Sequence, residues 1–310
     1  MAVLVTGGAG YIGGIAAQQL VEAGEQVVVL DSLVTGHRDA VPNSAVFVEG
    51  STLDRPLLDQ VLREHDIDTV MHFAASIEVG ESVRDPGKYF QNNVSGALSV
   101  LNAMTQAGVK HFIFSSTAAV YGNPEAVPIT EEMAVGPLNP YGLSKLMVEQ
   151  MLAWFASAHG LRYAILRYFN ACGASRERGE AHDPESHLIP NILMAAEGKR
   201  EHISVFGRDY PTPDGTCVRD YIHVEDLSDA HLKAMSYLRD GGESDVFNLG
   251  NNIGNSVLEV IETVKRVTGR DFPVVYADRR PGDSARLVAS SDKAQKILNW
   301  KPRKGAIATI

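Results

Sequence analysis

The sequence predicts an α/β protein: a Rossmann-type doubly wound parallel sheet with a smaller α/β substrate-binding lobe. Three observations predict it. Short runs of Val, Ile and Leu alternate with longer helical patterns through the first half of the chain. Several of these helical patterns end at a glycine, the usual residue after a helix C-terminus. A glycine-rich turn follows the first apolar run at once, which is where a doubly wound sheet binds its ligand.

The expected elements of the first half follow one another in strand–helix order. The helices run over residues 11–23, 92–107 and about 141–159, before Gly24, Gly108 and Gly160. The apolar composition of the strands indicates burial on both faces. We expect strands at residues 2–6, 26–30, 45–49, 69–73, 111–115 and 163–166.

After Asn170 the pattern loosens, and residues 171–187 form a polar, loop-like segment. We therefore expect two lobes, a dinucleotide-binding domain at 1–168 and a substrate lobe at 169–310, with residues near 219–240 packing back on the first. Residues 305–310 look like the opening of a helix that is then cut, as in a C-terminally truncated chain. Further helices are expected at 189–197, 225–238 and 256–268, and a strand at 246–249.

Charge and composition exclude several classes of protein. The formal net charge of -10 disfavours binding to nucleic acid or to an anionic membrane. No apolar run is long enough to span a bilayer, and no basic residue precedes the apolar start, so we expect neither a membrane span nor a signal peptide. Cys172 and Cys217 lack metal-ligand spacing and cannot form a disulfide framework. We expect no metal and a reducing, cytoplasmic location.

The glycine turn predicts a dinucleotide site. Gly7, Gly10 and Gly13 lie between a strand and a helix, where glycine lets the backbone approach a pyrophosphate. The N–H groups at the helix N-terminus then face the phosphates. Asp31 ends the next strand, and its carboxylate suits a ribose 2′-hydroxyl and repels a 2′-phosphate. These features favour NAD over NADP, and the alternative is an ordinary glycine-rich strand–helix turn.

Tyr141 and Lys145 are spaced to share one face of a helix. A phenol is a poor base at neutral pH, but a neighbouring ammonium and a nicotinamide cation both favour the phenolate. Tyr141 could then take a proton from a sugar hydroxyl while hydride leaves for NAD. Thr117 follows the strand at 111–115, at the edge where ligands bind, and could bridge that proton. Taken alone, the pair also fits a surface tyrosine and a solvated lysine.

These residues together identify a family resemblance. Gly7, Gly10 and Gly13 with Thr117, Tyr141 and Lys145 resemble the extended short-chain dehydrogenases. Longer stretches resemble the UDP-glucose 4-epimerases among them, from the first residues to about Trp300. The stretches are residues 6–13, 72–75, 79–82, 92–94, 115–122, 167–170 and 209–224.

The resemblance implies a mechanism with no net redox change. Tyr141 is the base toward the sugar 4-hydroxyl, Thr117 bridges the proton, and Lys145 binds the nicotinamide ribose. NAD removes hydride from C4, the 4-keto sugar turns over, and hydride returns to its other face. The implied NAD contacts are Gly7, Gly10, Tyr11, Ile12, Gly13, Asp31, Ser51, Thr52, Phe73, Ala74, Ala75, Asn92, Ser115, Tyr141, Lys145 and Tyr168.

Two departures from the family concern that cofactor. Ser51 stands where many members have an aspartate for the adenine amine, and Ile77 stands where many have a lysine. Both changes predict weaker retention of NAD.

The substrate is expected to be a UDP-sugar. Arg219 and Arg280 are the candidates for its two phosphates, because guanidinium groups suit phosphate oxygens. The resemblance adds Asn170 at the diphosphate, Phe206 at the uracil and Asp283 at the ribose. His187 is interpreted as an isolated pocket wall and not a catalyst. The full substrate set is Thr117, Asn170, His187, Leu188, Val205, Phe206, Arg219, Arg280, Asp283 and Leu287.

Other functions stay open at this point. Dehydratases carry an Asp-Glu pair after the strand-end threonine, whereas this chain has Ala118 and Ala119, which cannot move protons. The alternatives are a dehydratase, a 4-epimerase for UDP-N-acetylglucosamine or UDP-glucuronate, and a non-catalytic NAD sensor. Leu287 falls where the family gates sugar size, and it is intermediate between large and small residues.

The resemblance also implies a homodimer. The helices that end before Gly108 and Gly160 carry more apolar residues than one sheet face needs. These are Val100, Leu101, Met147, Met151, Leu152, Trp154 and Phe155.

Overall fold

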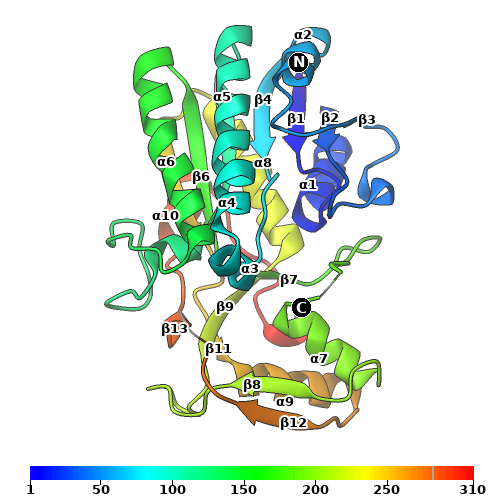
Figure 1. The fold of residues 1–310 in the computed structure, drawn as a ribbon, viewed down its shortest axis with the longest axis vertical. Coiled ribbons are helices and arrows are strands. Elements are labelled where there is room, and N and C mark those ends of the chain that lie inside the picture. Colours follow the sequence, from blue (N-terminus) through cyan, green and yellow to red (C-terminus); the bar gives the residue numbers. More distant parts are fainter. Residues whose placement is uncertain (184, 281–282) are drawn as a thin grey trace.

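The computed structural model describes residues 1–183, 185–280 and 283–310 (Figure 1). Its larger lobe contains a seven-stranded parallel sheet in the order β10-β6-β5-β4-β1-β2-β3. The order reverses between β1 and β4, and this switch point is where open α/β sheets bind ligands. The predicted fold class is confirmed. The strands are β1 (Ala2–Thr6), β2 (Gln26–Asp31), β3 (Val46–Glu49), β4 (Ile67–His72), β5 (His111–Thr117), β6 (Arg162–Tyr168) and β10 (Asp245–Leu249).

Helices cover both faces of this sheet. One buried cluster joins Leu20 of α1 to Leu227 of α8 and to Trp300, beyond α10. A second cluster on the other face joins α2, α5 and α6 through side chains such as Leu58, Leu101 and Leu152. The helices are α1 (Tyr11–Glu22), α2 (Arg55–Glu64), α5 (Gly96–Ala107), α6 (Pro140–His159), α8 (Val224–Arg239) and α10 (Asp292–Ile297).

Two strands extend further than their apolar runs. We expected β5 to end at Ser115 and β6 at Leu166, but they continue to Thr117 and Tyr168, which pair with each other. The additional residues are polar or aromatic, so a search for apolar runs does not identify them as part of a strand. Because of this extension, Thr117 is part of the sheet edge and its backbone is held by strand pairing.

The helix expected from Asn92 begins differently. A π-helical turn, η2 (Phe90–Ser95), precedes α5, and two short helices, α3 (Val79–Arg84) and α4 (Pro86–Tyr89), lie before it. Within this turn the Asn93 amide accepts from Ser76 N at 2.8 Å and donates to Ser144 Oγ at 2.9 Å. Single π turns often occur near functional sites, and this one ties the segment to α6.

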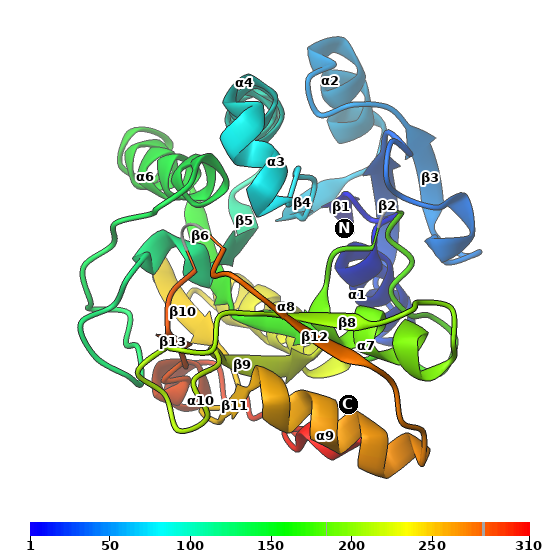
Figure 2. The same cartoon turned by 60° about the horizontal axis from the view of Figure 1, so that its bottom comes forward.

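The smaller lobe is built from shorter elements (Figure 2). β7 and β11 both pair with β9, which also pairs with β13, and β8 pairs with β12. β10, α8 and α10 come after residue 168 but pack in the larger lobe, so the later chain contributes to both. The elements are β7 (Asn170–Cys172), α7 (Leu188–Ala196), β8 (Ile203–Phe206), β9 (Val218–His223), β11 (Gly254–Ser256), α9 (Val257–Thr268), β12 (Val274–Ala277) and β13 (Arg286–Leu287).

The described part of the chain also contains the 3₁₀ turns η1 (Arg38–Ala40), η3 (Ala118–Tyr121) and η4 (Ile307–Thr309). The turn η4 lies within residues 305–310, which were expected to form the beginning of a helix. Ile307 and Ile310 pack against the core of the smaller lobe. Among the described residues, no helix has the length and apolarity required to cross a membrane.

Candidate active site

At two positions of the turn between β1 and α1, no residue larger than glycine fits. Gly7 has φ +74°, and a Cβ there would lie 2.5 Å from the amide nitrogen of Ala74. A Cβ on Gly13 would lie 2.2 Å from the carbonyl oxygen of Gly7. Gly10 precedes α1 and offers no capping side chain, so the first N–H groups of the helix are left for another acceptor. This cradle fits a pyrophosphate at the helix N-terminus.

Asp31 holds the same turn from the neighbouring strand. Its two carboxylate oxygens accept from Ala9 N and from Leu33 N, each at 2.9 Å. A carboxylate has about four lone-pair sites, so two hydrogen bonds leave it able to accept from a ribose hydroxyl. Asp31 therefore also shapes the turn, a role that the sequence did not reveal.

Of the other residues expected at the cofactor, several lie in α1, in η2 and in the segments that follow β3 and β4. Phe73 N and Ala74 N both donate to Thr6 O, at 2.9 and 3.1 Å. The Tyr11 hydroxyl donates to Gly173 O in the smaller lobe, and Asn92 Nδ2 donates to Ser76 Oγ at 3.2 Å. Ile12 packs at the edge of the core. Ala75 follows Ala74, and Ser51 and Thr52 follow β3.

Thr117 and Tyr141 meet where β5 ends and α6 begins. Asn139 caps α6 by accepting from Gly142 N at 2.9 Å, and Pro140 occupies the first helical position. This start places Tyr141 in the first turn, near the Thr117 side chain at the end of β5. Burial raises the pKa of Tyr141, Thr117 opposes the rise, and the charge of Glu78 adds to it. In the absence of other groups the phenol is therefore protonated.

Lys145 lies one turn further along α6 and is almost fully buried. Its Nζ donates to Ser115 O at 2.8 Å and lies 5.1 Å from the centre of the Phe114 ring. Burial lowers the pKa of Lys145 to about 7, although the charge of Glu149 opposes the shift. Lys145 thus joins the helix that carries Tyr141 to the strand that carries Ser115 and Thr117.

A buried network behind this site was not predicted. Glu149, on the next turn of α6, accepts from Ser116 Oγ at 2.5 Å. It also pairs with Arg167 of β6, with nitrogen–oxygen distances of 3.0 and 2.6 Å. Arg167 in turn donates to Tyr121 Oη at 2.8 Å. The signal in the sequence is the repeat of polar residues at 141, 145 and 149, which lie on one helix face.

Tyr168, another residue expected at the cofactor, contacts a histidine that the sequence did not single out. Its hydroxyl hydrogen-bonds with His231 Nε2, and the two rings meet edge to face. Burial lowers the pKa of His231 to about 4. The Phe73 ring also packs against His231, with ring centres 4.7 Å apart.

Five of the expected substrate residues lie on strands of the smaller lobe, namely Asn170, Val205, Phe206, Arg219 and Leu287. Arg219 donates to Ser284 O at 2.8 Å and lies 3.7 Å from an oxygen of Asp283. Leu287 is directly opposite Arg219 in the β13–β9 pair. The Arg280 guanidinium lies 3.8 Å from the centre of the Phe206 ring. Asn170 is exposed on β7, Val205 is buried on β8, and Leu188 begins α7.

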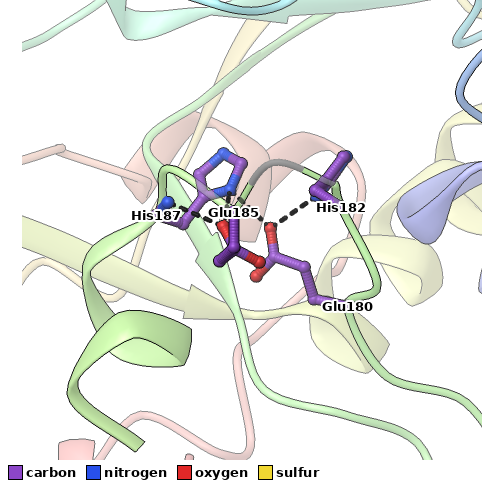
Figure 3. Close-up of side chains that lie close together, drawn as sticks. All are labelled: Glu180, His182, Glu185 and His187. Atoms are coloured by element: carbon purple, nitrogen blue, oxygen red, sulfur yellow. Dashed lines mark hydrogen bonds and ion pairs between the residues drawn. The ribbon is translucent and has the colours of Figure 1, made fainter. Parts of the chain in front are cut away.

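The interpretation of His187 as isolated is wrong. Its Nδ1 lies 2.7 Å from an oxygen of Glu180 and 2.9 Å from an oxygen of Glu185, while His182 Nδ1 lies 2.9 Å from Glu180 (Figure 3). Burial opposes ionisation of Glu180, but hydrogen bonds from the two histidines outweigh it and lower its pKa to about 2. The signal that could have revealed the cluster is the spacing Glu-x-His-x-x-Glu-x-His in a polar loop.

Comparison with known proteins identifies relatives over the whole chain. Residues 3–250 match the model of the NAD dependent epimerase/dehydratase family. A protein of Streptococcus mutans named UDP-glucose 4-epimerase is 52% identical over 314 residues, covering 100% of this chain and 94% of that protein.

Solved structures give the same picture. The UDP-glucose 4-epimerase of Brucella ovis in complex with NAD has a TM-score of 0.97 and 47% identity, covering 100% of this chain and 95% of that one. The UDP-glucose 4-epimerase of Bifidobacterium longum in complex with NAD+ and UDP has a TM-score of 0.95 and 39% identity, again covering 100% and 95%. At these identities the likeness extends beyond the fold.

Proposed function

The chain belongs to the NAD-dependent epimerase/dehydratase family, and we propose that it interconverts UDP-galactose and UDP-glucose by transient oxidation at C4 of the sugar. The observation that carries this proposal is the buried Lys145, whose Nζ is hydrogen-bonded to Ser115 O in the strand that ends at Thr117, one turn after Tyr141 on the same helix. Full-length relatives named UDP-glucose 4-epimerase at about half identity support it.

The residues around the glycine turn fit NAD. Gly7, Gly10 and Gly13 leave room for its pyrophosphate, and Asp31 is positioned to accept from the adenosine ribose. Lys145 would hold the nicotinamide ribose. When bound, NAD supplies a hydride acceptor that can return the hydride to the same carbon.

Tyr141 is the proposed base and acid of the reaction. It takes the proton of the sugar 4-hydroxyl as the 4-keto sugar forms, and it returns the proton when the keto group is reduced. Its raised pKa must first be lowered, and the ammonium of Lys145, one helical turn away, favours the phenolate. Thr117 orients the phenol and relays the proton between phenol and sugar.

The neighbours of Thr117 favour epimerisation over elimination. Ala118 and Ala119 follow it in η3, and neither side chain can exchange a proton. A dehydratase needs an additional acid and base at the sugar. The 4-keto sugar would therefore be reduced again and not lose water, which leaves the dehydratase and sensor alternatives less well supported.

We propose that residues 1–168 hold NAD and that 169–310 hold the UDP-sugar. The structure of the Bifidobacterium longum relative is a complex with NAD+ and UDP, which supports the binding of a uridine nucleotide beside NAD. Arg219 and Arg280 would bind the diphosphate, Phe206 would lie by the uracil, and Asp283 would hold the ribose. The strand pairing of Leu287 with Arg219 supports a place for Leu287 beside the sugar.

A direct assay tests the proposed activity. Purified protein is incubated with UDP-galactose and no added redox reagent, and the products are followed by proton NMR. UDP-glucose should appear until the two sugars reach equilibrium. Formation of a 4-keto-6-deoxy sugar would identify a dehydratase instead, and no reaction with any UDP-sugar would favour the sensor.

We also propose a homodimer through α5 and α6, which lie side by side (Figure 1). Val100, Leu101 and Leu152 are buried against the sheet, whereas the Trp154 side chain is 76% exposed. Met147, two turns before Trp154 on α6, and Leu98 on α5 are also exposed. Sedimentation of the wild type and of Trp154→Glu tests this, since the variant should shift toward monomer. The buried free thiols of Cys172 and Cys217 support a cytoplasmic location.

A further inference from the structure

We propose that Glu180, His182, Glu185 and His187 form a binding site for one divalent transition-metal ion of the zinc type, which holds the loop before α7 against the glycine turn. The inference goes beyond the proposed epimerase activity and does not depend on it. It starts from the position of the four side chains, which converge on one point (Figure 3).

The first argument is geometry. One ligand atom from each residue lies within 4.8 Å of the other three. In a tetrahedral zinc site with bonds of about 2.0–2.1 Å, neighbouring ligand atoms are roughly 3.3 Å apart. The closest pairs here are 2.7 to 2.9 Å apart. To form a coordination shell, the closest pairs would have to move apart by about half an ångström, and the most distant ligand atoms, up to 4.8 Å apart, would have to move together by about 1.5 Å.

The second argument is charge. The side chains of Glu180 and Glu185 are 7% and 9% exposed. Among the residues that the structure describes, neither carboxylate forms a salt bridge with lysine or arginine. Buried carboxylates need compensation. Burial lowers the pKa of His187, but hydrogen bonds with Glu180 and Glu185 outweigh it and raise this pKa to about 9, so the imidazolium supplies one positive charge. A divalent ion that displaces this proton would supply two.

The third argument is ligand chemistry. Two imidazoles and two carboxylates form a mixed nitrogen–oxygen set, which suits Zn²⁺ and its first-row neighbours better than Ca²⁺ or Mg²⁺. All four ligands come from residues 180–187, and none of the four lies in a helix or a strand. A shared ion would offset the entropy lost in ordering such a loop.

The loop is also placed to affect the cofactor turn. The Tyr11 ring meets the His182 ring edge to face, with ring centres 6.5 Å apart. His37 Nε2 lies 3.0 Å from Ala181 O, and Ser186 Oγ donates to Glu78 Oε1 at 3.0 Å. These contacts connect the loop to the larger lobe on both sides of the cluster. A metal ion would stabilise all of them together.

The test uses the full chain, purified without a metal-affinity tag and treated with a chelator. Zn²⁺ binding is measured by calorimetry, and Co²⁺ binding is measured by visible absorption. We expect one ion per chain and the intense absorption of tetrahedral Co²⁺. Glu180→Gln and His182→Gln should each weaken Zn²⁺ binding at least about tenfold, the smallest effect expected from disturbing a metal site. His202→Gln, which alters an exposed histidine outside the cluster, should bind Zn²⁺ like the wild type.

A second measurement needs no variant. Trypsin can cleave after Arg176, which is exposed in the same loop. Zn²⁺ should slow this cleavage several-fold in the wild-type protein, and chelator should restore it. Binding of less than one ion per ten chains, or equal affinity in the wild type and both cluster variants, would overturn the proposal. Either result would show that the four side chains form a metal-free hydrogen-bonded network.

Discussion

Lys145 Nζ donates a hydrogen bond of 2.8 Å to the carbonyl oxygen of Ser115. This contact joins the helix that carries Tyr141 to the strand that carries Thr117. Ser115 precedes Thr117 by two residues in the same strand. The lysine therefore holds Tyr141 and Thr117, the two residues of the proposed proton relay, at a fixed spacing and also places a positive charge near them. This contact requires Lys145 to be buried, and its burial should make the stability of the protein depend on pH.

The first prediction concerns pH. Burial lowers the pKa of Lys145 to about 7, while a lysine in an unfolded chain has a pKa of about 10.4. Between these values the unfolded chain binds more protons, so ligand-free stability rises with pH. Burying the charged form of Lys145 costs folding free energy, and Lys145→Met removes that cost. The variant should therefore have a higher Tm than the wild type, and the difference should be largest near pH 7 and shrink toward about pH 10. The measurement is thermal unfolding without NAD, with the exposed Lys296→Met as control. A gain that does not change with pH would contradict the assignment.

Tyr141→Phe tests the proposed proton transfer. The substitution removes the hydroxyl and keeps the ring, so binding should persist while kcat falls by about 10²- to 10⁴-fold. Steady-state kinetics with UDP-galactose measure the change. Tyr237→Phe, on α8 away from the site, is the matched control and should be fully active. If the two variants have equal kcat, Tyr141 is not the base.

Glu149→Gln tests the buried network behind the site. Glu149 and Arg167 are 5% and 7% exposed, and removing one partner of a buried pair typically costs about 3–5 kcal/mol. We expect a loss of this order in denaturant unfolding, and little change for the exposed Glu64→Gln. The double variant Glu149→Leu with Arg167→Met should recover part of the loss, because no buried charge is left unpaired. A double variant less stable than Glu149→Gln would show that the pair is not the cause.

Leu287 is predicted to set the size of the sugar that is accepted. Leu287→Ala should raise kcat/KM for UDP-N-acetylglucosamine relative to UDP-glucose, and Leu287→Tyr should lower this ratio. A change of side-chain size in a pocket is worth about 10- to 200-fold. Both ratios are measured by competition between the two sugars, with Leu287→Ile as control. A ratio that is the same in all variants would place Leu287 outside the sugar pocket.

Local patterns were enough to predict the glycine turn and the catalytic helix. Gly7, Gly10 and Gly13 are close in sequence, and Tyr141 and Lys145 are one helical turn apart, so their geometry follows from a single element. The extension of β5 to Thr117 depends on pairing with Tyr168. A propensity pattern contains no information about such a partner.

Contacts between distant elements were not predictable in the same way. Glu149 meets Arg167 because β5, β6 and α6 stack in one particular register. The cluster of Glu180, His182, Glu185 and His187 lies in a polar loop whose path is set by contacts with the larger lobe, such as that of Tyr11 with Gly173. Loop segments have no periodicity from which side-chain direction can be read.

The central claim is that the hydride removed from C4 is stored in the protein and returned to the same carbon. Incubation of UDP-galactose deuterated at C4 with the protein in ordinary water tests it most directly, with the UDP-glucose analysed by NMR and mass spectrometry. We predict that deuterium is retained at C4 of the product and that unlabelled substrate in deuterated water gains none there. Loss of the label from C4, or uptake of solvent deuterium at C4, would contradict the account.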